Sequence, residues 1–70
     1  MKITANDFSE KDIIRILREW TGLTQREFGE SIGKSEAVIQ TYEQGIRNYS
    51  FKTLQKIAKI HGITITFEKK

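Results

Sequence analysis

Helix-capping residues and glycines divide the chain into short helical segments. Residues that favour the start of a helix precede each apolar-periodic run, namely Ser9, Thr24, Ser35 and Ser50. Glycines that favour a helix end follow these runs, at positions 22, 33, 45 and 62. The pattern predicts helices over about residues 10–20, 25–32, 35–43 and 51–61, with only short turns between them.

The chain has 70 residues, which predicts a single domain over residues 1–70 with one core. Cysteine is absent, so a disulfide framework and a thiol nucleophile are excluded. The first residues lack the apolar run of a signal peptide, and no segment is long enough to span a membrane. We therefore expect a soluble cytoplasmic protein without membrane contact.

The charge favours a polyanionic partner only weakly. Twelve Lys and Arg oppose nine Asp and Glu, and the excess lies in residues 44–70, with six basic and one acidic side chain. No paired carboxylates, nucleophile with a histidine base or phosphate-binding glycine loop is recognisable, and His61 is the only histidine. We expect no enzymatic activity, no cofactor and no metal site.

Most aromatic side chains fall at positions that predict burial rather than a stacking surface. In the last helix Phe51 belongs to an apolar stripe with Leu54, Ile57 and Ala58. We expect the following aromatic residues to lie in the core or in an interface: Trp20, Phe28, Tyr42, Phe51 and Phe67.

The end of the chain changes from helical to alternating periodicity. Ile63, Ile65 and Phe67 alternate with polar residues, which predicts a half-buried β-strand over 63–68. A single strand needs a partner. Two partners fit equally well: residues 2–4 of the same chain, or the same strand of a second subunit.

Residues 25–44 form two short helices joined by a glycine-containing turn. In the second of these, Val38, Ile39 and Tyr42 share one side. Small or amide-bearing residues occupy the other side, namely Ala37, Gln40, Thr41 and Gln44. Two helices joined in this way can present the second one to the major groove of DNA.

At these positions the sequence resembles the Cro and lambda-repressor type of helix-turn-helix protein, the XRE family. The resemblance covers roughly residues 13–62, and its matching positions are Leu17-Arg18, Gly22-Leu23-Thr24-Gln25, Phe28-Gly29, Ile32-Gly33, Ser35, Ile39, Tyr42-Glu43 and Gly45. It implies a mainly α fold: a compact four-helix domain with a short C-terminal β-strand. It also implies a transcription regulator that binds double-stranded DNA sequence-specifically, a repressor of phage or mobile-element type in the cytoplasm or nucleoid of a bacterial host.

The resemblance assigns DNA-contacting roles to individual residues. Base edges would face Ser35, Glu36, Ala37, Gln40 and Thr41, and the Gln40 amide suits the N6 and N7 atoms of adenine. Glu36 departs from the family pattern. Its carboxylate can accept from cytosine N4, or it can merely favour the positive end of its helix, and both readings stay open.

Phosphate contacts are expected from Gln25, Arg26, Lys34, Arg47, Asn48 and Ser50. Tyr49 stands where the family commonly has proline, which predicts a less rigid loop. The resemblance also pairs Arg18 with Glu43 in a structural bridge between the first and third helices.

Proteins of this type usually bind as two-fold dimers, so we expect a homodimer on a palindromic operator, with Ile63, Ile65 and Phe67 at the interface. The alternative is a protein-interaction module with the same fold, such as an antitoxin, an adaptor or an antirepressor partner. A regulatory protein partner is compatible with either function.

Overall fold

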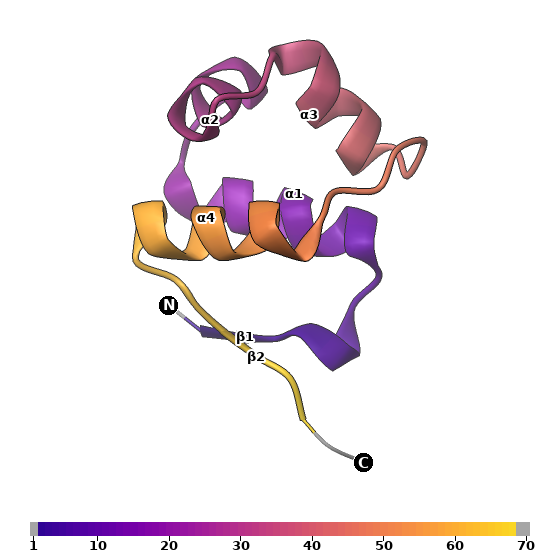
Figure 1. Cartoon of the computed structure of the whole chain (residues 1–70), viewed down its shortest axis with the longest axis vertical. Helices are drawn as coiled ribbons and strands as arrows, with labels where there is room; N and C mark the ends of the chain where they lie inside the picture. The colour runs from indigo at the N-terminus through magenta and orange to yellow at the C-terminus, as the bar shows by residue number, and fades with distance from the viewer. Residues whose placement is uncertain (1, 69–70) are drawn as a thin grey trace.

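Four α-helices lie above a pair of short strands in the computed structural model, which describes residues 2–68 (Figure 1). The elements in chain order are β1 (Lys2–Thr4), the 3-10 turn η1 (Ala5–Asp7), α1 (Glu10–Thr21), α2 (Gln25–Ile32), α3 (Glu36–Glu43), α4 (Phe51–His61) and β2 (Thr64–Thr66). The predicted mainly α, four-helix fold is confirmed. Among the described residues, no helix is long and apolar enough to cross a membrane.

Three of the four predicted N-caps form as expected. Ser35 accepts from the amide of Val38, and Ser50 accepts from that of Thr53. Thr24 forms a full capping box with Glu27: its hydroxyl accepts from the Glu27 amide at 3.1 Å, and its own amide donates to the Glu27 carboxylate at 3.0 Å. Hydrogen bonds from the Thr24 backbone and side chain lower the pKa of Glu27.

The start of α1 differs from this pattern. Ser9 occupies the N-cap position, but its hydroxyl donates to the Asp12 carboxylate at 2.8 Å instead of accepting from an amide. The Ser9 hydroxyl bonds to the carboxylate because a charged acceptor forms a stronger hydrogen bond than a neutral one. This hydrogen bond lowers the pKa of Asp12.

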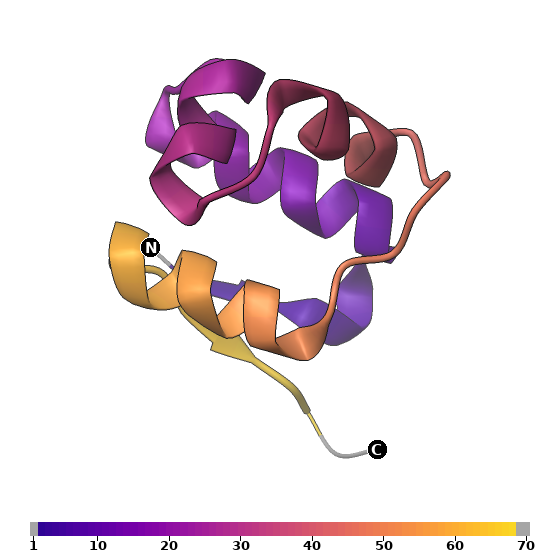
Figure 2. The same ribbon diagram turned by 45° about the horizontal axis from the view of Figure 1, so that its top comes forward.

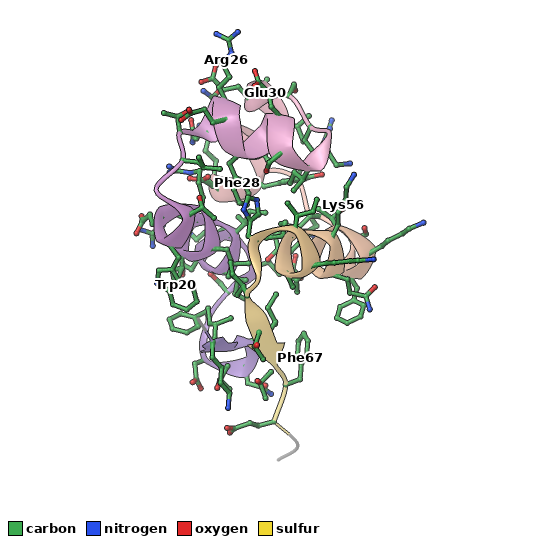
Figure 3. The ribbon with its side chains drawn as sticks, turned by 90° about the vertical axis from the view of Figure 1, so that its left-hand side faces the viewer. Trp20, Arg26, Phe28, Glu30, Lys56 and Phe67 are labelled. Atoms are coloured by element: carbon green, nitrogen blue, oxygen red, sulfur yellow. The ribbon has the colours of Figure 1, made fainter. Side chains whose placement is uncertain are left out.

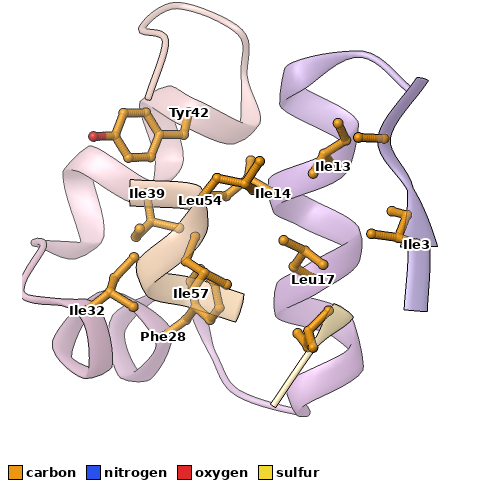
Figure 4. Packing of buried hydrophobic residues seen from close by; sticks show 12 residues of the cluster. Ile3, Ile13, Ile14, Leu17, Phe28, Ile32, Ile39, Tyr42, Leu54 and Ile57 are labelled. Atoms are coloured by element: carbon orange, nitrogen blue, oxygen red, sulfur yellow. The ribbon is translucent and has the colours of Figure 1, made fainter. Parts of the chain in front are cut away.

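The core lies between the four helices and the two strands (Figure 4). Its largest fully buried side chains come from α1, α2, α3 and α4, and they are Ile14, Leu17, Phe28, Ile32, Ile39 and Ile57. Because each helix buries only one stripe, the helices depend on one another for stability.

β2 pairs with β1 of the same chain, in parallel and in the register Ile3 to Ile65. Of the two partners considered from the sequence, the structure has the intrachain one. The strand covers Thr64–Thr66 rather than 63–68, because β1 offers only three residues for pairing. Beyond the strands, the Asn6 side chain donates to the Glu68 carbonyl at 2.9 Å and accepts from the Glu68 amide at 2.7 Å.

Two residues of the expected aromatic set, Phe51 and Phe67, lie outside the core, which leaves an interface as the predicted location for them. Phe51 is 58% exposed and Phe67 is 57% exposed, and their rings pack against each other at 5.8 Å. Phe51 begins α4, where no neighbouring helix covers it, while Leu54 and Ile57 further along the stripe are buried. Phe28 and Tyr42 are buried as predicted, and Trp20 is partly buried against the core.

Gly29 is the point of closest approach between α2 and the segment that follows it. A Cβ atom at this position would lie 2.6 Å from the backbone oxygen of Lys34 and 3.1 Å from Cγ1 of Ile39. The turn and the start of α3 therefore lie directly on the backbone of α2, which only a residue without a side chain allows.

We expect Gly29→Ala to destabilise the protein by about 1–3 kcal/mol, because the new methyl group meets a backbone atom that cannot rotate away. The sign is diagnostic, since alanine in an open helical position would raise stability by about 1 kcal/mol. Chemical denaturation measures the change. Glu30→Ala, at the exposed neighbouring position of α2, is the control and should stay within about 0.5 kcal/mol of the parent; a neutral or stabilising Gly29→Ala would contradict the close approach.

Candidate nucleic-acid interface

α3 lies at the surface of the domain, packed through one side only (Figure 2). Ile39 and Tyr42 are buried, and Val38 packs against the core. On the opposite side Ala37, Gln40 and Gln44 are exposed. The inward and outward sides predicted from the sequence are therefore confirmed.

The proposed base-reading residues share this open side but differ in the groups they leave available. Ser35, Glu36, Ala37 and Gln40 are exposed, while Thr41 is half-buried. The Thr41 hydroxyl donates to the Val38 carbonyl at 2.7 Å, so its oxygen and methyl group remain for other contacts. The Ser35 oxygen already accepts from the Val38 amide at 3.2 Å. Gln40 is therefore the residue best placed for a bidentate contact.

A partly buried ion pair joins the end of α3 to α1. Nε of Arg18 lies 2.7 Å from a Glu43 oxygen, and a second guanidinium nitrogen donates to the other carboxylate oxygen at 3.0 Å. Arg18 also donates to the Leu23 carbonyl at 3.2 Å. The Glu43 hydrogen bond raises the pKa of Arg18. The bridge that the family resemblance implied is thus present, and it is bidentate.

Gln25 belongs to the same network. Its amide nitrogen donates to Glu43 at 3.4 Å, and its side chain is half-buried. This hydrogen bond positions the start of α2 against the end of α3. It uses one of the two N–H groups of the amide, so the second N–H remains available to a phosphate. Its predicted phosphate contact stays a prediction.

The other predicted phosphate-binding residues lie on both sides of α3. Arg26 is exposed on α2 and pairs with Glu30 at 3.2 Å, and Figure 3 shows both side chains extending from the outer side of that helix. Arg47 and Asn48 are exposed in the loop after α3. Exposed ion pairs of this kind are weak, so Arg26 can exchange its partner at small cost.

The loop after α3 begins with a Schellman motif. Gly45 has a φ of 77°, its amide donates to the Tyr42 carbonyl, and the Ile46 amide donates to the Thr41 carbonyl at 3.0 Å. The Arg47 amide also reaches the Thr41 carbonyl, at 3.3 Å. This bonding holds the backbone of Arg47 against the end of α3.

Tyr49 anchors the far end of the same loop. Its hydroxyl donates to the Glu10 carbonyl at 2.7 Å, and its ring meets that of Tyr42 edge-on at 5.5 Å. Burial raises the pKa of Tyr49 to about 12, with a further contribution from the Glu10 charge. A tyrosine therefore supplies, by packing and a hydrogen bond, an anchor at the position where the family commonly has proline.

A basic groove continues from this surface along α4. We name it the α4 groove; it is open, has a volume of about 540 Å³, and its polar lining includes Lys34, Ser50, Lys52, Thr53, Lys56 and Lys59. Lys34 and Ser50 were predicted as phosphate contacts. The other three lysines were not predicted as phosphate contacts, because their proximity to Lys34 depends on how α4 packs beside α2.

His61, at the end of α4, contributes to packing. Its ring stacks on that of Phe28 at 5.4 Å, and Nε2 lies 2.9 Å from the Ser31 hydroxyl. Within residues 2–68 no group of three or more His, Cys, Asp or Glu side chains is arranged to hold a metal ion.

Comparison with known proteins places the chain in a family. The helix-turn-helix family model matches residues 14–67, so the chain belongs to the helix-turn-helix family, of the XRE type that its sequence resembles. It is similar to uncharacterised helix-turn-helix-type transcriptional regulators of Sinorhizobium medicae and Rhizobium meliloti, each 35% identical over 54 residues, or 77% of this chain.

A third relative, from Sinorhizobium fredii and named in the same way, is 39% identical over 46 residues, covering 66% of this chain and 32% of its own length. The chain spans only 39% of the length of the first two relatives. No solved structure matches the chain significantly.

The Arg18–Glu43 pair generates a stability prediction. Arg18→Ala should cost about 2–3 kcal/mol, somewhat less than the loss for a fully buried pair, because it leaves the Glu43 carboxylate, 7% exposed, without its main partner. Arg15→Ala is the matched control on the same helix. Arg15 is 48% exposed and pairs with Asp12 and Glu19 at 3.4 Å, so its loss should change stability by at most about 0.5 kcal/mol. Equal effects of the two substitutions in thermal or chemical unfolding would show that the bridge does not hold α3.

Proposed function

We propose that the protein binds double-stranded DNA sequence-specifically as a transcription regulator, with α3 in the major groove. The observation that carries the proposal is the outer side of α3, where Ala37 and Gln40 are exposed while Ile39 and Tyr42 anchor the helix from behind. An anchored helix with short or amide side chains on its free side suits contact with base edges.

The base contacts we propose come from Ser35, Glu36, Ala37, Gln40 and Thr41. Gln40 would donate to and accept from adenine N6 and N7, and the methyl groups of Ala37 and Thr41 would meet thymine methyl groups. Glu36 would accept from cytosine N4, or serve only the start of α3, where its negative charge is favourable.

Affinity would come mainly from the DNA backbone. The phosphate contacts we propose supply positive charge or hydrogen-bond donors from α2, from the turn before α3 and from the loop after it, namely Gln25, Arg26, Lys34, Arg47, Asn48 and Ser50. The relatives are named helix-turn-helix-type transcriptional regulators, which supports a regulatory role over an enzymatic one. We further propose a repressor of phage or mobile-element type that works in a bacterial cytoplasm.

DNA selection followed by binding measurements tests the proposal. We expect a random duplex library to yield a preferred sequence, and Gln40→Ala to lose about 1–3 kcal/mol of discrimination at the base pair that Gln40 contacts. Fluorescence anisotropy at several salt concentrations gives both affinity and salt dependence. Glu36→Ala in the same assay separates a base contact, which changes the preferred sequence, from a helix-end role, which does not.

Arg47→Ala is the control for a backbone contact. It should weaken binding to preferred and random DNA equally and reduce the salt slope by about 0.9. Circular dichroism verifies that each variant is folded. Failure of the selection to enrich any sequence would reject specific recognition and favour the alternative function, a protein-interaction module.

We propose that two copies bind a palindromic site, with half-sites about 34 Å apart. Ile63 is buried in its own subunit, so the contact would rest on Ile65 and Phe67. These two residues line an apolar groove of about 220 Å³ with Phe51, Leu54 and Ala58, and the pair β1–β2 leaves an outer strand edge beside it.

Phe67→Lys should convert this dimer to a monomer, because an ammonium group cannot enter an apolar contact unpaired. Sedimentation velocity with and without operator DNA measures the change. Ile60→Lys is the control: Ile60 is exposed on α4 but does not line the groove. A Phe67→Lys protein that sediments as a dimer would remove this face from the interface.

A further inference from the structure

The α4 groove gathers positive charge on one side of the domain. Four lysines line it, Lys34 from the turn before α3 and Lys52, Lys56 and Lys59 from α4, and its lining contains no acidic side chain. The remaining polar groups are two hydroxyls, of Ser50 and Thr53, and the Gln55 amide. A groove of this composition attracts an extended polyanion.

The position of Lys56 shows how the groove is built. Its ammonium lies 3.5 Å from the site that a Cβ atom on Gly33 would occupy. Gly33 ends α2, whose last turn has no basic residue of its own. Figure 3 shows Lys56 on the part of α4 that lies beneath α2. Lys56 is exposed, and its ammonium lies beside the negative end of α2 at the edge of the groove.

The start of α4 adds further donors at one end of the groove. The first turn of α4 has no acidic residue, and Ser50 caps it by accepting from the Thr53 amide at 3.1 Å. A helix start of this kind favours an anion. In the groove it adds to the lysines, which stand further along the same helix.

The groove is continuous with the surface proposed to contact DNA. Lys34 lies one residue before the N-cap of α3, and Ser50 lies just after the loop that carries Arg47 and Asn48. A backbone strand that passes α3 at this side would meet Lys34, Ser50 and the α4 lysines, because they line one groove.

We infer that the α4 groove binds a run of phosphates on the DNA backbone that flanks the base pairs contacted by α3. Lys56 is the central contact, with Lys52 and Lys59 on either side of it along α4. This inference rests on the proposed DNA-binding function. It extends the footprint beyond the turn and the loop, and it gives a function to the basic excess of the C-terminal part of the chain. The contact carries no sequence information, because phosphates are the same at every base pair.

The test pairs lysine variants with altered DNA. Lys56→Ala and Lys59→Ala, singly and together, are compared with Lys2→Ala, which removes the same charge from β1 on the other side of the domain (Figure 1). Each groove variant should reduce the slope of log K against log salt by about 0.9, with equal loss on preferred and random DNA. Lys2→Ala should leave the slope unchanged.

A duplex carrying single neutral methylphosphonates locates the contact. For the parent protein, one or more phosphates flanking the preferred sequence should be sensitive to neutralisation, and Lys56→Ala should abolish that sensitivity at one of them. Wild-type binding to the preferred duplex verifies the proposed function independently. If that binding is present while Lys56→Ala and Lys59→Ala keep both its affinity and its salt slope, the groove does not bind DNA. The inference is then overturned, and a groove for an acidic protein partner becomes the better explanation.

Discussion

The orientation of α3 depends on a backbone contact that no side chain can adjust. The Lys34 carbonyl oxygen lies only 2.6 Å from the site that a Cβ on Gly29 would occupy, so α2 and the turn meet backbone to backbone. This contact determines where α3 begins relative to α2. Once α3 begins there, its period of 3.6 residues directs Ile39 and Tyr42 into the core and leaves Gln40 outside. The proposed DNA-contacting side is thus a consequence of one missing side chain.

The opposite end of α3 is held by charge instead of close packing. Arg18, Glu43 and Gln25 join three helices in one hydrogen-bonded network. Ion pairs that are shielded from water add little net stability, because desolvation offsets their attraction, but they strongly disfavour arrangements that separate them. The network therefore serves mainly to align the three helices. A small domain with a modest core gains from such a constraint, since few apolar contacts are available to specify one arrangement.

The sequence predicted what is local and left open what is distant along the chain. Capping of α2, α3 and α4 depends on residues three positions apart, and the two sides of α3 depend on helical spacing, so both were readable. The partner of β2 and the Asn6–Glu68 contact join residues about sixty positions apart, and no local pattern determines them. Phe51 belongs to the apolar stripe of α4 but lies exposed. Helical spacing predicts which residues share a side of a helix, but it does not predict how far the neighbouring helices extend along that side. The α4 groove likewise depends on how α4 packs beside α2, which no local sequence pattern determines.

The parallel pairing of β1 with β2 places both strands, and with them residues 2 and 68, on the side of the domain opposite α2 and α3 (Figure 1). A fluorescent dye, a surface tether or a second copy joined through a linker can therefore be attached at either strand without crossing the outer side of α3. The Asn6 side-chain amide forms two hydrogen bonds with the backbone of Glu68. A label attached beside Glu68 is therefore held to the body of the domain. Movement of such a dye or tether would then report the tumbling of the whole domain.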